Sequence, residues 1–129
     1  MTKRDIMTKK FEARGYKVWN FDRIYLNINK AYYDLDKDAY IYDKEDEEEV
    51  GELKAKLEAE ENELIAEIEK SFEEFKDEKP RLAGKHTVDK LLKVRPNLEA
   101  RFEQTTWELK VDNVAVGVEF TKEGLVTIR

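Results

Sequence analysis

The chain has 129 residues, 40% of them hydrophobic, with six Phe, six Tyr, two Trp and no Cys. This length suffices for one hydrophobic core, so we expect a single α+β domain over residues 1–129, without disulfides or thiolate metal sites. Because no apolar run approaches the roughly 18 residues of a membrane span and the charged N-terminus is unlike a signal peptide, we expect a cytoplasmic protein.

The charge is concentrated in one segment. Residues 43–78 contain 17 acidic residues and 5 Lys, a net charge of −12, whereas the whole chain carries −6; the other 93 residues therefore carry +6. The sequence predicts an acidic limb on a mildly basic body.

The first half of the chain predicts a helix followed by strands. Residues 1–14 favour a helix, with Thr2 as its N-cap and Gly15 as its stop. Aromatic and β-branched residues then alternate with polar ones over residues 16–43, which predicts an antiparallel meander. Turn residues separate its strands at 20–22, 29–30 and 36–38.

A long amphipathic helix is predicted from about 45 to 78, ending before Pro80. Its apolar stripe comprises Val50, Leu53, Leu57, Leu64, Ile68, Phe72 and Phe75. Glu60 and Glu61 interrupt the stripe. A straight helix of this length would span about 50 Å, against about 35 Å expected for the domain, so the helix either breaks near 60–62 or extends beyond the body.

The last third predicts two short helices and a three-stranded antiparallel meander. We expect the helices within 87–104, with Thr87 as a cap and Pro96 between them. The three strands follow in the C-terminal tail, with turns at 112–113 and 122–124. The apolar residues of the two short helices are expected in the core: Leu91, Leu92, Val94, Leu98 and Phe102.

Residues 34–45 match the ligand pattern of an EF-hand calcium loop. The matching acidic residues are Asp34, Asp36, Asp38 and Glu45. Ala39 stands where that loop needs Gly, and the preceding residues have strand rather than helix periodicity. We therefore expect a β-hairpin here and no metal site or cofactor.

Catalytic residues are scarce, which favours a non-enzymatic protein. The chain has a single His and a single Ser. We expect His86 to be a surface or capping residue, and Ser71 to lie near the apolar stripe of the long helix. Glu108 and Lys110 share one face of a predicted strand, a spacing that some magnesium nucleases use, but ordinary polar alternation gives the same pattern.

The acidic face of the long helix is the main candidate for a binding surface. It comprises Glu48, Glu52, Glu58, Glu63, Glu69, Glu73 and Asp77. A row of carboxylates can imitate a nucleic-acid backbone toward a basic protein. A solvated face that aids solubility is the alternative.

A direct nucleic-acid-binding protein is the second hypothesis, and a metal-dependent nuclease the third. The basic segment 79–101 would contact phosphates, and an N-terminal aromatic run would stack on bases. The residues expected for this role are Lys85, Lys90, Lys93, Arg95, Trp19, Phe21, Arg23 and Tyr25.

The stretch KVWNFDRIYLN, followed by AYYDLDKDAYIYD, resembles a segment of short uncharacterised proteins of phages and mobile elements. The shared features are a Trp before an Arg-Ile-Tyr-Leu-Asn strand and a Tyr-rich hairpin. The resemblance covers about a quarter of the chain and implies no catalytic residues. It implies a phage-type anti-defence or anti-CRISPR inhibitor in the cytoplasm of an infected bacterium, whose partner would be a nucleic-acid-handling enzyme.

Overall fold

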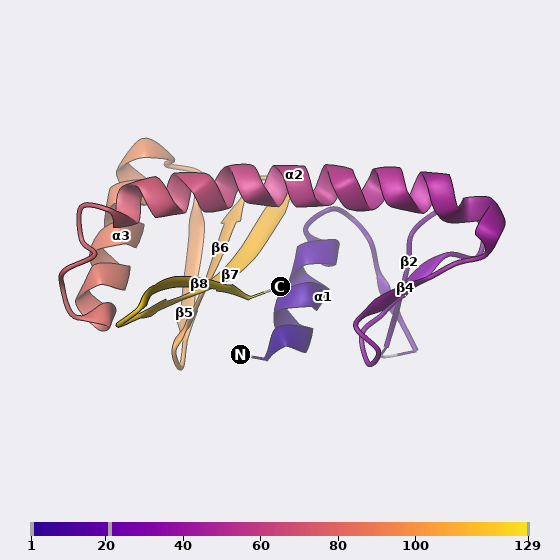
Figure 1. Cartoon of the computed structure of the whole chain (residues 1–129), viewed down its shortest axis with the longest axis horizontal. Helices are drawn as coiled ribbons and strands as arrows, with labels where there is room; N and C mark the ends of the chain where they lie inside the picture. Colours follow the sequence, from indigo (N-terminus) through magenta and orange to yellow (C-terminus); the bar gives the residue numbers. More distant parts are fainter. Residues whose placement is uncertain (1, 21, 129) are drawn as a thin grey trace.

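The computed structural model describes residues 2–20 and 22–128, and one long helix organises the chain (Figure 1). The helices are α1 (Lys3–Glu12), the short 3-10 helix η1 (Lys44–Asp46), α2 (Glu47–Phe72) and α3 (Pro80–Val94). The first sheet contains β1 (Val18–Trp19), β2 (Arg23–Tyr25), β3 (Tyr32–Asp34) and β4 (Ala39–Ile41). The second contains β5 (Glu99–Glu103), β6 (Thr106–Val111), β7 (Val114–Thr121) and β8 (Gly124–Ile128).

Both sheets are antiparallel meanders whose spatial strand order follows the sequence, β1 to β4 and β5 to β8. Figure 1 shows the two sheets under opposite halves of α2, with α1 between them. The α+β class is therefore confirmed, and the C-terminal meander has four strands rather than the three expected. No helix in the described part of the chain is long and apolar enough to cross a membrane.

The N-terminal helix begins where local sequence signals place it and ends close to its predicted stop. The Thr2 hydroxyl accepts a hydrogen bond from the backbone N–H of Asp5, and the Asp5 side chain accepts one from the backbone N–H of Thr2, which completes a capping box. Gly15 has a φ of 88°, a conformation that suits Gly after a helix. The predicted N-cap is confirmed, whereas the helix ends at Glu12, slightly before the predicted stop.

The long helix α2 is continuous, so the first of the two alternatives, a break near residues 60–62, is wrong. Glu61 lies on the buried side of the helix and is 3% exposed. Its Oε1 atom is 2.8 Å from Lys10 Nζ and 3.8 Å from an Arg14 guanidinium nitrogen. Lys10 of α1 and Arg14, which follows α1, therefore lie opposite the gap in the apolar stripe. The helix does not overhang the body because the two sheets lie side by side beneath it (Figure 1).

The prediction of two short helices in residues 87–104 is also wrong. A single helix, α3, starts at Pro80, and its N1 proline suits a first helical turn. Thr87 is not a cap; it is buried within α3, and its hydroxyl donates to the carbonyl oxygen of Ala83 at 2.7 Å. The second predicted helix is strand β5, paired with β6 from Glu99↔Lys110 to Glu103↔Thr106.

Two hydrophobic cores lie along α2, one against each sheet. Val50 and Leu57 of α2 belong to the core of the first sheet. The second core has more members, including these residues from α2, α3 and the sheet: Leu64, Ile65, Ile68, Val88, Leu91, Leu109 and Val118. The predicted stripe of α2 is thus divided between the two cores.

The helix α1 packs in the first core and against the second sheet, on the face opposite the second core. Met7 and Phe11 pack in the first core. On another side of the helix, Ile6 lies against Gly117 of β7, where an added Cβ would be 2.7 Å from Ile6 Cδ1. Gly117 therefore permits the close approach of α1 to the second sheet.

Candidate functional site

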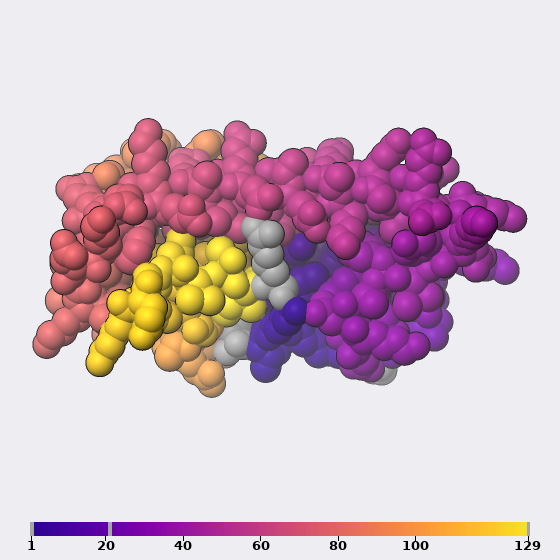
Figure 2. All heavy atoms as spheres, viewed as in Figure 1, coloured from indigo at the N-terminus to yellow at the C-terminus, as the bar shows by residue number. Residues whose placement is uncertain are grey.

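All seven acidic residues predicted for partner binding lie on the exposed side of α2 or just after it: Glu48, Glu52, Glu58, Glu63, Glu69, Glu73 and Asp77. The helix α2 forms a continuous ridge along one long edge of the molecule (Figure 2). At 1.5 Å per residue, its 26 residues span about 39 Å. The structure therefore presents five of these carboxylates along one rigid element, and Glu73 and Asp77 follow it.

Several other acids of this segment are paired with cations from elsewhere in the chain. Arg14 approaches Glu60 at 3.4 Å, and Arg95 approaches Glu67 at 2.8 Å. With the buried Glu61, three of the ten acids in α2 are thus neutralised by residues outside the helix. The candidate surface is therefore limited to the outward carboxylates, and it also includes the three Lys of α2.

The basic residues predicted to contact nucleic acid are dispersed and partly neutralised. Lys90 Nζ is 2.6 Å from a Glu74 carboxylate oxygen, and Arg95 makes two contacts with the Glu67 carboxylate, at 2.8 and 3.1 Å. Lys85 and Lys93 are exposed. The acidic Glu67 and Glu74 weaken the field that this segment would present to phosphates.

The aromatic run lies on the first sheet, under the opposite half of α2 from α3 (Figure 1). Trp19 is 57% exposed. The Arg23 guanidinium lies 4.6 Å from the ring centroid of Tyr32, which itself contacts Tyr25. Phe21 lies outside the described residues. The structure therefore does not bring these side chains together with the basic residues of α3.

The predicted hairpin replaces the calcium loop. Strands β3 and β4 pair from Tyr32↔Ile41 to Asp34↔Ala39. Asp34 Oδ1 accepts hydrogen bonds from the backbone N–H groups of Asp36 and Lys37, at 2.9 and 3.0 Å, and so closes the turn. Asp38 pairs instead with Lys3 and with the Tyr33 hydroxyl, and Glu45 lies in η1.

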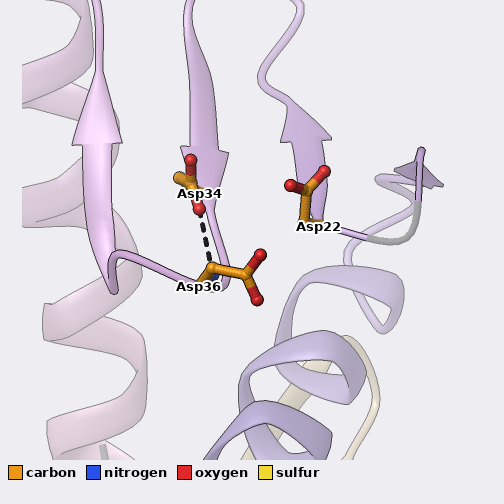
Figure 3. A group of neighbouring side chains, drawn as sticks. All are labelled: Asp22, Asp34 and Asp36. Atoms are coloured by element: carbon orange, nitrogen blue, oxygen red, sulfur yellow. Dashed lines mark hydrogen bonds between the residues drawn. The ribbon is translucent and has the colours of Figure 1, made fainter.

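A different group of acids meets at this end of the sheet. Carboxylate oxygens of Asp22, Asp34 and Asp36 lie within 4.8 Å of one another (Figure 3). Asp34 is already engaged by the turn, and Arg4 pairs with Asp36. Asp34 thus closes the β3–β4 turn, and Asp36 joins this turn to α1.

The hairpin also contains two tyrosines with perturbed acidity. Burial, and the hydrogen bond to the Asp38 carboxylate, raise the pKa of Tyr33 well above its usual value. Lys3 and the Tyr33 hydroxyl lower the pKa of Asp38 in turn. Burial, followed by the nearby Glu61 and Glu58 carboxylates, raises the pKa of Tyr40 to about 12. Both tyrosines stay protonated at neutral pH and cannot act there as bases.

The residues considered for catalysis are in structural contacts. His86 Nδ1 is 2.8 Å from Glu78 Oε1, and its ring contacts Phe75. Ser71 is buried on α2. On β6, a Glu108 carboxylate oxygen is 2.9 Å from Lys9 Nζ, and Lys110 is 3.7 Å from Glu99. Within the described residues, the metal-competent acidic cluster does not include Glu108.

The sequence did not predict an apolar groove between α3 and the second sheet. The groove has a volume of about 870 Å³ and is lined mainly by apolar side chains of α3, β5, β6 and β7, with the charged Arg81, Lys85 and Asp89 of α3 also in its wall. Three residues expected in the core are exposed here or nearby: Leu92 at 37%, Phe102 at 45% and Val94 at 66%. Phe102 stacks on Trp107 with ring centroids 4.9 Å apart. The alternation of apolar and charged residues in 99–103 is the sequence pattern that could have predicted strand β5.

Comparison of the chain with protein-family models, curated proteins and solved structures finds no match. The resemblance to phage and mobile-element proteins therefore remains a hypothesis.

Proposed function

We propose that this protein is a non-enzymatic interaction protein that binds a basic protein partner through the outward carboxylates of α2. The observation that carries the proposal is the exposure of all seven predicted acids, five of them along one continuous helix of 26 residues and Glu73 and Asp77 just after it. A rigid row of like charges steers a basic partner and fixes its orientation without first having to become ordered.

The position of the acids within α2 supports a role beyond folding. Negative side chains stabilise a helix near its N-terminus, and the first turn indeed contains Glu47, Glu48 and Glu49. Near the C-terminus, however, negative charge opposes the helix dipole. Glu69 lies there and Glu73 is the C-cap residue, with Lys70 as the basic residue of the last turn. Glu73 is paired with Lys76 at 3.1 Å, but helix stability does not account for Glu69.

The charge density limits what the helix can imitate. The ten acids and three Lys of α2 give −7 over about 39 Å, and the three acids paired with cations outside the helix leave −4. Duplex DNA carries one charge per about 1.7 Å of its axis, or about 3.4 Å for each strand. The outward charge of α2 is sparser than that of one strand, so the sharpest form of the proposal is an inhibitor that occupies part of the single-strand path of a nucleic-acid-handling enzyme.

The test is a pull-down from a bacterial lysate at low and high salt, followed by competition with single-stranded DNA. Wild-type protein should capture a basic protein in a salt-sensitive way, and the DNA should displace it. Replacing Glu58, Glu69 and Glu73 by Gln should abolish capture. The matched control removes three exposed charges elsewhere, with Glu12→Gln, Asp112→Asn and Glu123→Gln, and should capture normally.

Two results would contradict the proposal. If the triple Gln variant captures the same protein with the same salt dependence, the acidic face is a solvated surface. If the purified protein itself shifts labelled nucleic acid at micromolar concentration and physiological salt, it is a direct nucleic-acid-binding protein, the alternative hypothesis.

A further inference from the structure

The strand β5 is an open edge of the second sheet. In the described part of the chain β5 pairs with β6 alone, and all five of its residues are exposed. The two-residue turn between β5 and β6 makes Glu103 and Thr106 a hydrogen-bonded pair. Hydrogen-bonded pairs alternate along an antiparallel ladder, so the backbone N–H and C=O groups of Ala100 and Phe102 point away from β6.

The two faces of this edge have different chemistry. Ala100 and Phe102 line the apolar groove beside α3, where Leu82 is 48% exposed. The other face carries Glu99, Arg101 and Glu103, an alternation of negative, positive and negative charge. A strand added at this edge would place apolar side chains at the groove and charged side chains on the opposite face.

The pairing of β5 with β6 shows which charges fit. Glu99 lies opposite Lys110 and Arg101 opposite Glu108, so β6 presents a basic and an acidic residue in complementary order. Lys110 Nζ is 3.7 Å from a Glu99 carboxylate oxygen. Opposite charges on directly opposed residues stabilise a strand pair, and like charges destabilise it. The free side of β5 therefore favours a strand with the same order of charges as β6.

We propose that β5 binds an extended peptide segment of a partner protein by strand addition. The segment has the pattern basic, apolar, acidic, apolar, basic, with its acidic residue opposite Arg101. Its basic residues lie opposite Glu99 and Glu103, and its apolar residues lie beside the groove. This surface is separate from the acidic face of α2 and does not depend on the function proposed for it.

A second copy of this chain fits the edge poorly. In the symmetric antiparallel register that uses the whole strand, Arg101 would face its own copy and Glu99 would face Glu103. Both arrangements oppose like charges. In this full-strand register the charge pattern disfavours pairing of two copies and leaves the edge open to a complementary strand.

The test uses two synthetic peptides that differ in charge order alone, Lys-Leu-Glu-Val-Lys and Glu-Leu-Lys-Val-Glu, each blocked at its ends and labelled for fluorescence anisotropy. Wild-type protein should bind the first peptide roughly tenfold more tightly, since three cross-strand charge pairs change sign. A protein with Glu99→Lys, Arg101→Glu and Glu103→Lys should reverse that preference. Circular dichroism checks that this variant folds.

A second measurement needs only the wild-type protein. N-methylation of the first peptide on the backbone nitrogens that face β5 should remove binding, because strand addition requires those N–H groups. Equal binding of the two charge orders, binding that survives N-methylation, or no binding at millimolar peptide would overturn the proposal. Light scattering that shows a dimer dissociated by Arg101→Glu would also overturn it, by assigning the edge to a second copy.

Discussion

The ion pair beneath the middle of α2 makes a strong prediction about stability. Glu61 is 3% exposed, and the side chains of its partners Lys10 and Arg14 are 10% and 5% exposed. Replacing Glu61 by Ala would leave two cations in a site with little access to water. Removing one partner of a buried pair typically costs about 3–5 kcal/mol. A small domain has a free energy of unfolding of about 5–15 kcal/mol, so this loss is a large part of the total.

The geometry of the ion pair around Glu61 favours a loss of stability near the lower end of about 3–5 kcal/mol. Glu61 Oε1 is close to Lys10 Nζ but has no hydrogen-bond partner within the described residues, so the attraction is largely Coulombic. Arg14 also keeps its contacts with the Leu57 carbonyl and with Glu60, both at 3.4 Å. We therefore expect Glu61→Ala to lower the free energy of unfolding by about 3 kcal/mol.

Urea unfolding followed by circular dichroism measures this loss. Glu58→Ala, one turn earlier and exposed, is the matched control and should change stability little. The double variant Lys10→Met with Glu61→Leu should be far more stable than Glu61→Ala, because an apolar pair needs no compensating charge. The reasoning is refuted if Glu61→Ala costs no more than the control.

Three further predictions test other features of the structure. Gly117→Ala should lower the free energy of unfolding by about 1–3 kcal/mol in urea, and by less in an Ile6→Ala background, since the new Cβ meets Ile6. Tyrosines of the unfolded chain ionise near pH 10, whereas Tyr40 has a pKa of about 12; thermal stability should therefore fall as pH rises through this window, and fall less for Tyr40→Phe. Glu69→Gln should raise the melting temperature slightly at low salt and Glu48→Gln should lower it, so changes of the same sign would contradict the dipole argument.

Local signals predicted much of the first half of the fold. The capping residues around α1 act within one turn, and the alternating aromatics of the first sheet are set by the two faces of each strand. The stripe of α2 was correct from Val50 to Phe72, because its spacing reflects one buried side of a helix, whereas the helix ends before Phe75. Each of these features depends on residues close together in the chain.

The errors came from contacts between distant residues. Glu61 interrupts the stripe of α2, and nothing near it in sequence shows that Lys10 and Arg14 lie opposite. In β5, the segment Glu99 to Glu103 has strong helix formers, yet pairing with β6 overrides that preference. The exposure of Phe102 could not be predicted either, since it depends on how far α3 stands from the edge of the sheet.

The inner face of α2 gives the last prediction, which separates folding from binding. Leu64 is 7% exposed and packs in the core that includes Ile68 and Val88. Leu64→Ala should cost about 2–4 kcal/mol, because it leaves a cavity where α2 meets the second sheet. The outward carboxylates stay in place in every molecule that remains folded.

Capture of the basic partner by Leu64→Ala should therefore fall only in proportion to the folded fraction measured by circular dichroism. The Gln substitutions at Glu58, Glu69 and Glu73 should do the opposite, removing capture while the protein stays folded. If Leu64→Ala remains folded and yet loses the partner, binding requires the inner face of α2 to be exposed. The function would then depend on opening of the helix from the sheet, and not on its acidic surface.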